Sequence, residues 1–232
     1  MEFMLLFLER RGAPAGGPEC LAEMGKFAAE LARQGKLRRG APLRPEAGAA
    51  RVRVRDGQRV VIDGPFAESK EVLGGFWIVD VASREEALDI ARRAPHARQG
   101  IVEVHPLEFR NAYPDSGLGT PFLFAFCAQP RIVDADRSKL REMLDFSETL
   151  AQQGKLLETA PLAADPPPAR LETQAGKLVV TDGPFAEAKE VVGGYGLLRA
   201  ASRAEAVEIA KRYPHAKWGP IVLREIQFFD RT

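Results

Sequence analysis

Four ionisable side chains lie within nine positions of one loop, at Asp63, Glu68, Lys70 and Glu71. The loop begins Asp-Gly-Pro-Phe, and a carboxylate held there beside a cleft could act as a general base or bind a ligand. A structural interpretation competes with this one, because Asp and Gly suit a tight turn, Pro fixes the backbone, and Phe66 would anchor the loop in a core. The residue types alone leave both interpretations open.

The loop recurs 119 positions later with the same types of ionisable residue. A candidate residue is therefore supported when its equivalent in the other copy is of the same type. Asp63 and Asp182 are the candidate acid or base groups. The candidate ligand-binding residues are Phe66, Glu68, Lys70, Gly74, Gly75, Phe185, Glu187, Lys189, Gly193 and Gly194. The glycine pairs in this set would either let the backbone approach a ligand closely or form a β-bulge where a strand begins.

Two of the three histidines, His96 and His215, are also equivalent, and each follows a proline that is expected to end a helix. They are candidates for general acid or base chemistry, or for a favourable charge at a helix C-terminus. His105 falls opposite Arg224 in the other copy, which predicts an exposed strand residue. His96 and His215 are therefore the candidate functional histidines, and His105 is not a candidate.

These residues belong to one unit that is written twice. Between residues 63 and 97, 22 of 35 positions match the residues 119 places later, whereas the segment around 47–59 matches poorly. Periodicity, capping and turn signals predict the same order in each copy: strand, helix, strand, hairpin, strand, helix, strand. In the first copy we expect these elements near 3–8, 21–31, 37–43, 52–62, 76–81, 83–94 and 101–109.

Two helices and a mostly antiparallel sheet per copy predict an α+β fold of two ferredoxin-like units, each with an inserted hairpin. Helices cover one face of such a sheet, and the other face, to which Phe and Trp are expected to contribute, needs a second cover. We therefore expect the copies to pack sheet to sheet about a pseudo-twofold axis, rather than as two separate beads. The predicted domains are 1–110 and 121–232, joined by a linker at 111–120.

Composition argues against several classes of partner. There are 33 Lys and Arg residues against 32 Asp and Glu, a net charge of +1, so no nucleic-acid partner is predicted. The longest apolar stretches, 4–8 and 122–127, fall far short of the roughly 20 residues of a membrane span. The two cysteines, Cys20 and Cys127, are not equivalent, which predicts neither a disulfide framework nor a metal site and favours a reducing cytoplasm. Signature motifs for dinucleotides, nucleotides, zinc proteases and serine hydrolases are absent, and no cofactor is predicted.

The pattern Asp-Gly-Pro-Phe-Ala-Glu-x-Lys-Glu-x-x-Gly-Gly, followed by a Ser-capped helix and a closing strand, resembles the DGPF domain of the YCII-related family. The resemblance covers both copies and implies ferredoxin-like units paired as a dimeric α/β barrel, here fused into one chain as a monomeric pseudo-dimer or a homodimer of it. The wider family is associated with a His–Asp pair and with small enzymes that act on aromatic or chlorinated compounds. Here the His positions fall near Met24 and Met143 and the Asp positions at Ala94 and Tyr213, so both partners are absent.

Two functions of different classes follow. The first is a small-molecule-binding or regulatory protein, whose ligand lies in clefts near the repeated loops and the sheet interface. The alternative is a cofactor-independent enzyme, such as a lyase, an isomerase or a dehalogenating enzyme, that uses Asp63 or Asp182 as acid or base in a cavity. A buried pocket into which Asp63 or His96 points would favour the enzyme. If Asp63 bonds only the backbone amides of its own loop, the catalytic hypothesis fails.

Overall fold

The computed structural model describes residues 1–12, 16–128, 137–183, 185 and 190–228. Repeat 1 (residues 1–110) contains β1 (Glu2–Arg10), α1 (Pro18–Arg33), β2 (Leu37–Pro42), η1 (Glu46–Gly48), β3 (Ala50–Arg55), β4 (Gln58–Asp63), β5 (Glu71–Asp80), α2 (Arg84–Arg93), η2 (Pro95–Arg98) and β6 (Ile101–Pro106). Repeat 2 (residues 121–232) contains β8 (Thr120–Ala128, which begins one residue earlier), α3 (Arg137–Gln152), β9 (Leu156–Pro161), β10 (Ala169–Gln174), β11 (Lys177–Asp182), β12 (Val191–Ala200), α4 (Arg203–Arg212), η3 (Pro214–Lys217) and β13 (Ile221–Glu225). Between them lies the short strand β7 (Asn111–Ala112).

Local sequence signals set the ends of these elements. Ser83 caps α2 and Ser202 caps α4, each accepting a hydrogen bond of 3.2 Å from the backbone amide three residues on. Helices α1 and α3 are both followed closely by a glycine with positive φ, Gly35 and Gly154, which ends the helix in the left-handed conformation. The turn at 56–57 has positive φ at both residues, 51° and 73°, which suits the tight hairpin of β3 and β4.

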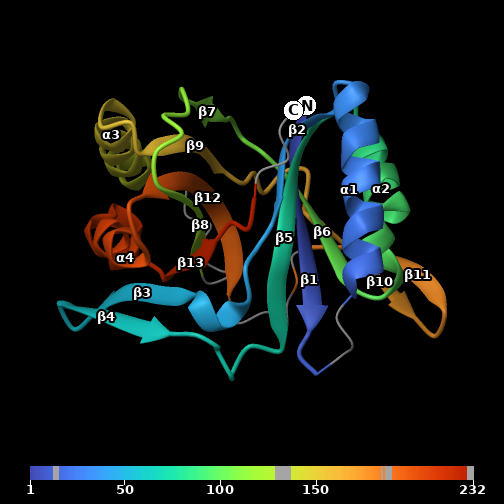
Figure 1. Ribbon diagram of the computed structural model, residues 1–232, viewed down its shortest axis with the longest axis horizontal. Coiled ribbons are helices and arrows are strands. Elements are labelled where there is room, and N and C mark those ends of the chain that lie inside the picture. Colours follow the sequence, from blue (N-terminus) through green and yellow to red (C-terminus); the bar gives the residue numbers. More distant parts are fainter. Residues whose placement is uncertain (13–15, 129–136, 184, 186–189, 229–232) are drawn as a thin grey trace.

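Two antiparallel sheets lie face to face in the middle of the molecule, and the helices cover their outer faces (Figure 1). The first sheet has the strand order β11-β10-β6-β1-β5-β2 and is covered by α1 and α2. The second has the order β4-β3-β13-β8-β12-β9-β7 and is covered by α3 and α4. Buried side chains form one core between each sheet and its helices, and a third core between the sheets. The expected sheet-to-sheet pseudo-dimer of two ferredoxin-like repeats is confirmed.

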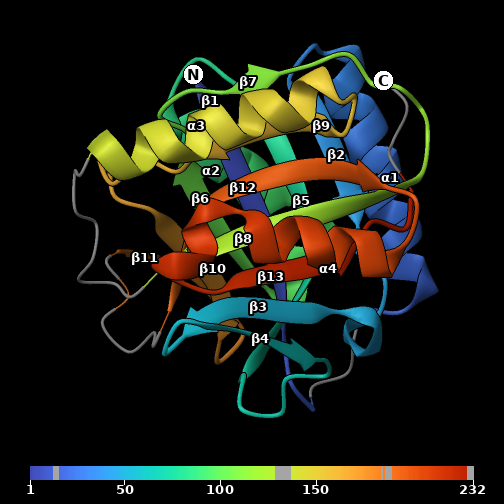
Figure 2. The same ribbon diagram turned by 90° about the vertical axis from the view of Figure 1, so that its left-hand side faces the viewer.

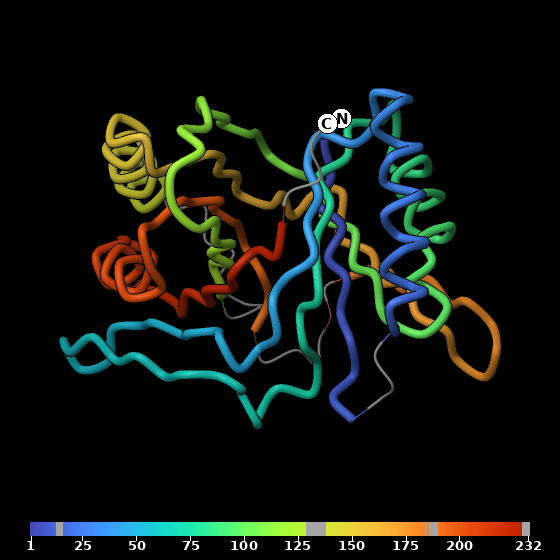
Figure 3. Tube along the Cα trace, in the orientation of Figure 1, coloured from blue at the N-terminus to red at the C-terminus, as the bar shows by residue number. Residues whose placement is uncertain are grey.

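The hairpin of each repeat joins the sheet of the other repeat. Strand β3 pairs with β13, so the hairpin β3–β4 extends the sheet of repeat 2, as Figure 2 shows. Strand β10 pairs with β6, so the hairpin β10–β11 extends the sheet of repeat 1. In the tube of Figure 3, the cyan hairpin runs beneath the half coloured yellow to red, and the orange hairpin lies on the side of the blue helix. Each sheet is therefore built from both halves of the sequence.

Two neighbouring aromatic residues of β5 face opposite layers. Phe76 lies in the core between the sheets. Trp77 lies in the helix-covered core, with its ring centroid 4.9 Å from that of Phe7 and 5.8 Å from that of Phe27. The expectation that Trp belongs with Phe on the sheet-to-sheet face was wrong for Trp77, because successive side chains of a strand alternate between its two faces.

Candidate functional site

A cavity of about 110 Å³ lies between α1 and the sheet of repeat 1. Strands β1, β2 and β5, the turn η2 and the segment that follows β13 supply the rest of its wall. Its wall is mainly apolar and includes three aromatic side chains, whereas its ionisable side chains are few. The lining residues are Phe7, Glu9, Gly16, Cys20, Leu21, Met24, Gly25, Ala41, Pro42, Gly74, Gly75, Trp77, His96 and Phe228.

Glu9 is the acidic residue of this wall. It is half-buried, and the Cβ position at Gly74 would lie 3.4 Å from its Oε1 atom. Its neighbours Arg10 and Arg11 form ion pairs with other carboxylates. The carboxylate of Glu9 makes no hydrogen bond or ion pair within the part of the chain that the structure describes. A carboxylate without a donor at the edge of an apolar cavity is a natural contact for a hydrogen-bond donor of a ligand.

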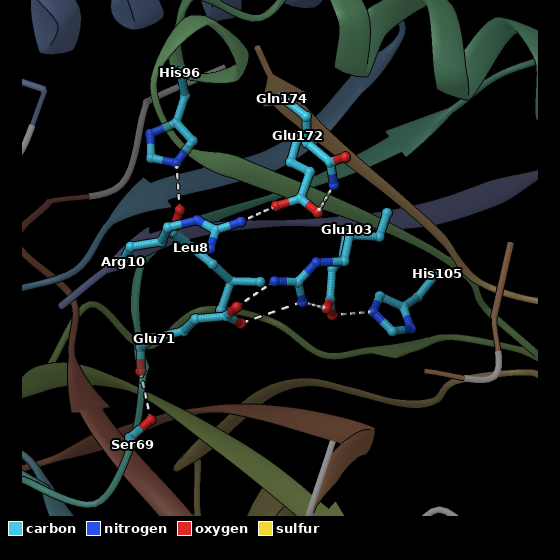
Figure 4. A network of polar contacts seen from close by, with 10 residues as sticks. Leu8, Arg10, Ser69, Glu71, His96, Glu103, His105, Glu172 and Gln174 are labelled. Atoms are coloured by element: carbon cyan, nitrogen blue, oxygen red, sulfur yellow. Dashed lines mark hydrogen bonds and ion pairs between the residues drawn. The ribbon is translucent and has the colours of Figure 1, made fainter. Parts of the chain in front are cut away.

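His96 lines the cavity, and its Nε2 atom lies 2.9 Å from the carbonyl oxygen of Leu8 (Figure 4). His215 makes the equivalent contact with Cys127, at 2.8 Å. A carbonyl oxygen only accepts, so Nε2 carries the proton and Nδ1 is an acceptor when the ring is neutral. Burial lowers the pKa of His215, and its hydrogen bond to Cys127 opposes the shift. Both rings thus tie the turn after a helix to a strand, and neither of these bonds goes to a helix end.

The glycine pairs form β-bulges, one of the two roles considered for them. Gly74 is skipped where β1 pairs with β5, and Gly193 is skipped where β8 pairs with β12. Gly75 lies so close to β2 that a Cβ atom there would be 3.0 Å from the carbonyl oxygen of Ala41. A side chain at this position would push the strands apart. In repeat 1 the bulge also brings Gly74 and Gly75 into the cavity wall.

Repeat 2 builds the equivalent part of its core differently. Tyr213 is fully buried there, with its ring centroid 4.9 Å from those of Phe126 and Phe146. These two phenylalanines are the counterparts of the pair that contacts Trp77 in repeat 1. Tyr213 therefore takes the packing role of Trp77, from the end of a helix instead of from a strand.

Four positions change together between the repeats. Room for Trp77 requires Gly40, because a Cβ atom at residue 40 would lie 2.4 Å from the indole ring. The hydroxyl of Tyr213 instead lies 2.6 Å from that of Ser147. The set is Ala28, Gly40, Trp77 and Ala94 in repeat 1, and Ser147, Thr159, Gly196 and Tyr213 in repeat 2. Each repeat thus packs one large aromatic side chain against its own pair of equivalent phenylalanines, and the residues around that side chain differ in size between the repeats.

Asp63 and Asp182 form ion pairs at the surface with the opposite repeat. Asp63 pairs with Arg203 at the start of α4, and Asp182 pairs with Arg84 at the start of α2. The two aspartate side chains are 72% and 61% exposed, and neither lines the cavity. Since Arg84 and Arg203 are equivalent residues, the two ion pairs are related by the pseudo-twofold axis. Each one fastens the end of an exchanged hairpin to the helix of the other repeat.

The glutamates at the end of the motif make a second pair of contacts of this kind. Arg51 of β3 binds Glu190, and Arg170 of β10 binds Glu71. Arg170 also lies 3.0 Å from Glu103, which accepts a hydrogen bond of 2.9 Å from the histidine at position 105 (Figure 4). Acidic groups of the repeated motif therefore bind the exchanged hairpin of the opposite repeat.

The remaining predicted binding residues lie along the loops. Glu68 and Lys70 are exposed, and Phe66 is half-buried. Phe185 is half-buried, with the guanidinium carbon of Arg170 6.0 Å from its ring centre. None of these four side chains lines the cavity. Glu187 and Lys189 lie outside the described residues.

His105 and Arg224 are both buried, with 4% and 3% of their surface exposed. The prediction of an exposed His105 was therefore wrong. The reason is the sheet-to-sheet packing: His105 lies opposite Met4 and Arg224 opposite Leu123, and both of these partners belong to the core between the sheets. The face that would be open in a single unit is therefore covered by the other repeat. The guanidinium of Arg224 donates to the carbonyl oxygens of Leu73 and Arg44, and burial lowers its pKa.

Arg39 and Glu158 occupy the same position in the two repeats and also contact each other. The Nε atom of Arg39 lies 3.2 Å from Oε2 of Glu158, whose side chain is 1% exposed. Arg110 lies 3.2 Å from the same carboxylate, and the hydroxyl of Tyr195 donates to it at 2.5 Å. Equivalent residues meet only beside a twofold or pseudo-twofold axis. The ion pair between Arg39 and Glu158 therefore lies beside the pseudo-twofold axis that relates the repeats.

Among the described residues, no group of three or more His, Cys, Asp or Glu side chains is arranged to hold a metal ion. No helix within these ranges is both long and apolar enough to cross a bilayer. Cys20 and Cys127 are free thiols, and burial raises the pKa of Cys127 to about 12.

Comparisons with known proteins agree with the internal duplication. The model of the YCII-related domain family matches residues 1–109 and again residues 121–230. Uncharacterized protein R00369 of Rhizobium meliloti (strain 1021) is 49% identical over 75 residues, which are 32% of this chain and 60% of that protein, so the match spans less than two thirds of the relative. A heme-binding protein from Thermus thermophilus superposes with a TM-score of 0.41 and 12% identity, over 97% of this chain and 90% of that one. Because the family model matches both halves of the sequence, the chain belongs to the YCII-related domain family and carries its domain in tandem.

Proposed function

We propose that the chain is a small-molecule-binding protein and that its ligand occupies the cavity between α1 and the sheet of repeat 1. The observation that carries the proposal is a space of about 110 Å³ with aromatic walls and one acidic group, Glu9, whose carboxylate has no partner in the described chain. Gly74 and Gly75 of the repeated motif line the same space, which supports the expectation that the motif lies beside a ligand.

Under this proposal Asp63 and Asp182 hold the exchanged hairpins and do no chemistry. Their exposure and their ion pairs with Arg203 and Arg84 favour a structural role, because a carboxylate in open solvent lacks the environment that tunes a general base. The positions that the family resemblance gives to a His–Asp pair hold Met24 and Ala94 in repeat 1, and neither can carry a proton. His96 lines the cavity, which taken alone favours the enzyme alternative, but its Nε2 atom is bonded to the backbone carbonyl oxygen of Leu8, which favours a structural role for the ring. Together these features favour binding over catalysis.

Filling the cavity tests the proposal. Gly25 lines it, and a Cβ atom there would meet nothing within 4 Å, so Gly25→Leu adds a side chain where there is room. Repeat 2 already has Leu144 at this position. Leucine favours a helix by up to about 1 kcal/mol over glycine, so the variant is expected to fold. Ala29→Leu, on the exposed side of the same helix, is the matched control.

The readout is a fragment screen by NMR with the full chain, which follows the indole N–H signals of its two tryptophans, Trp77 and Trp218. We expect fragments that shift the Trp77 signal to lose this effect in Gly25→Leu and to keep it in Ala29→Leu. Hits that survive Gly25→Leu would place the binding site elsewhere and remove the proposal.

A further inference from the structure

Resting on the proposed function, we infer that the ligand of the repeat 1 cavity is a small organic cation, an amine that is protonated at neutral pH. The inference comes from the polar atoms that the cavity wall leaves without partners and from the aromatic side chains that surround them. The ligand class is thus an organic cation, and the cation site lies in repeat 1 only.

Two ionisable groups of the wall, Glu9 and His96, offer hydrogen-bond acceptors. The carboxylate of Glu9 makes no hydrogen bond or ion pair in the described chain. His96 uses its Nε2 proton for the carbonyl oxygen of Leu8, which leaves Nδ1 as an acceptor in the neutral ring. A ligand that brings several N–H donors and a positive charge therefore matches both groups, whereas a carboxylate ligand would face Glu9 with a charge of the same sign.

Aromatic side chains complete the recognition of a cation. Phe7, Trp77 and Phe228 line the cavity, and the faces of aromatic rings attract ammonium groups, with Trp the most effective. Phe228 comes from repeat 2, so the chain's second half contributes to a site that lies in the first. The apolar wall also suits the alkyl part of an organic amine better than it suits a hydrated metal ion.

The arginine side chains near Glu9 bind other groups and not its carboxylate. Arg10 pairs with Glu172, and Arg11 pairs with Glu46. Arg224 lies within electrostatic range of Glu9 but donates to two backbone carbonyl oxygens instead of to its carboxylate. The field of Arg224 offsets part of the charge of Glu9 at a distance. Direct contact with the Glu9 carboxylate remains open to a ligand.

Repeat 2 does not carry the same set of groups. The counterparts of Glu9 and Trp77 are Ala128 and Gly196, and the counterpart of Cys20 is Lys139. Without the carboxylate and the indole, and with a lysine added, the equivalent region has no preference for a cation. We therefore expect one cation site per chain, in repeat 1.

The size of the cavity limits the ligand. An apolar cavity of about 150 Å³ accommodates benzene, so a space of about 110 Å³ suits a group of about five heavy atoms. Butylamine, butan-1-ol and butyrate are therefore suitable probes, because they share an alkyl chain and differ in charge: positive, neutral and negative.

The test is a titration of the isotope-labelled full chain with each probe at pH 7 and constant ionic strength, followed at the two indole N–H signals. The indole of Trp77 donates no hydrogen bond within the described chain, so its signal is a sensitive reporter. Trp218 lines a separate cavity that includes Glu190, so its signal reports whether a probe binds there instead. We expect butylamine to shift the Trp77 signal saturably, with a Kd at least tenfold lower than that of butan-1-ol and with the Trp218 signal unmoved. Glu9→Gln is expected to abolish the tenfold preference while butan-1-ol still binds. Glu85→Gln, which makes the same change of charge on the exposed surface of α2, leaves the preference intact.

The two levels of the proposal fail in different ways. If butan-1-ol or butyrate shifts Trp77 as strongly as butylamine does, or if Glu9→Gln leaves the preference unchanged, the cavity binds a ligand of another class and only this inference is overturned. If none of the three probes shifts the Trp77 signal at concentrations up to tens of millimolar, the inference fails, and the screen with Gly25→Leu decides separately whether the cavity binds anything.

Discussion

The helix-covered cores of the two repeats share a backbone plan and solve one packing problem in two ways. Repeat 1 supplies its large aromatic side chain, Trp77, from the middle of β5. Repeat 2 has glycine at that position and supplies Tyr213 from the residue that follows α4. Both rings lie 4.9 Å from equivalent phenylalanines, Phe7 and Phe126. Both cores therefore hold an aromatic ring at the same place, although it comes from different positions of the sequence.

The comparison also separates two kinds of information in a duplicated sequence. Residues that match between the copies, such as Asp63 and Asp182, hold the exchanged hairpins, which both halves need equally. Residues that differ, such as Glu9 and Trp77, surround the cavity, which we assign to one half. Matching residues thus hold the shared framework and form part of the cavity wall, and the differing residues Glu9 and Trp77 make the cavity of repeat 1 different from the equivalent region of repeat 2.

The largest effect is expected from Tyr213→Ala, which gives repeat 2 the residue that repeat 1 has at this position. The change removes a fully buried ring and its hydrogen bond to Ser147, so the free energy of unfolding falls by about 3–5 kcal/mol. Trp77→Ala is expected to cost less, because the indole borders an existing cavity. Urea denaturation of both variants measures the difference. Equal losses of the free energy of unfolding would contradict a difference in packing between Trp77 and Tyr213.

Charge reversal at the pseudo-twofold axis tests how far the repeats have specialised for each other. Arg39→Glu places a second carboxylate beside the buried Glu158, and we expect a loss of about 2–3 kcal/mol, because Arg110 still binds Glu158 and Arg39 is partly exposed. Combining Arg39→Glu with Glu158→Arg restores opposite charges, so the double variant should lose less than the two single variants predict when their effects are added. Additive losses in a double-mutant cycle would contradict a direct interaction.

The two hairpin contacts allow a smaller test of asymmetry. Arg170 binds both Glu71 and the half-buried Glu103, whereas Arg51 is paired with Glu190. We expect Arg170→Met to reduce the free energy of unfolding by about 2 kcal/mol, because it leaves Glu103 with one cationic neighbour fewer, and Arg51→Met to reduce it by about 1 kcal/mol. Unfolding midpoints of the two variants at equal salt decide the order. The reverse order would show that the network around Glu103 adds nothing.

The smallest effect concerns His215, whose pKa burial lowers below the ordinary value of 6.5. The unfolded chain then binds the proton more readily, so this residue's contribution to stability is fully present above pH 6.5 and declines as the pH falls through 6.5 toward the lower pKa of the folded state. The slope from one proton cannot exceed about 1.4 kcal/mol per pH unit. His215→Gln should flatten the pH dependence of the free energy of unfolding in that window, and Lys217→Gln should not. An unchanged slope in His215→Gln would contradict the prediction.

Most of the fold could be predicted from the sequence because its signals are local or repeated. The Ser-capped helices, the glycine C-caps and the turn at 56–57 depend on residues within a few positions, and each lies where its pattern predicts. The sheet-to-sheet arrangement follows from the duplication and from the apolar face that each copy must cover. The exchange of hairpins could not be predicted, because pairing β3 with β6 or with β13 satisfies the same alternation of residues.

The candidate site was located only in part. Gly74, Gly75 and His96 line the cavity, and the match between the copies singled them out. Glu9 and Trp77 could not be predicted from the match between the copies, because their counterparts are Ala128 and Gly196. The signal that could have found them was in the sequence: Trp77 against Gly196, with Gly40 against Thr159, is a compensated change in volume between two copies of one core.

The exchanged hairpins also govern the order of events when the chain emerges from the ribosome. When residues 1–110 have been made, β6 still lacks its neighbour β10, and the hairpin β3–β4 has no partner until β13, the last strand of the fold, is complete. The first half therefore cannot finish folding while the second is being synthesised, as an ordinary N-terminal domain can. Contacts between distant parts of the sequence must form before either sheet is complete, which slows folding. The duplicated chain therefore folds as one unit and not as two independent domains.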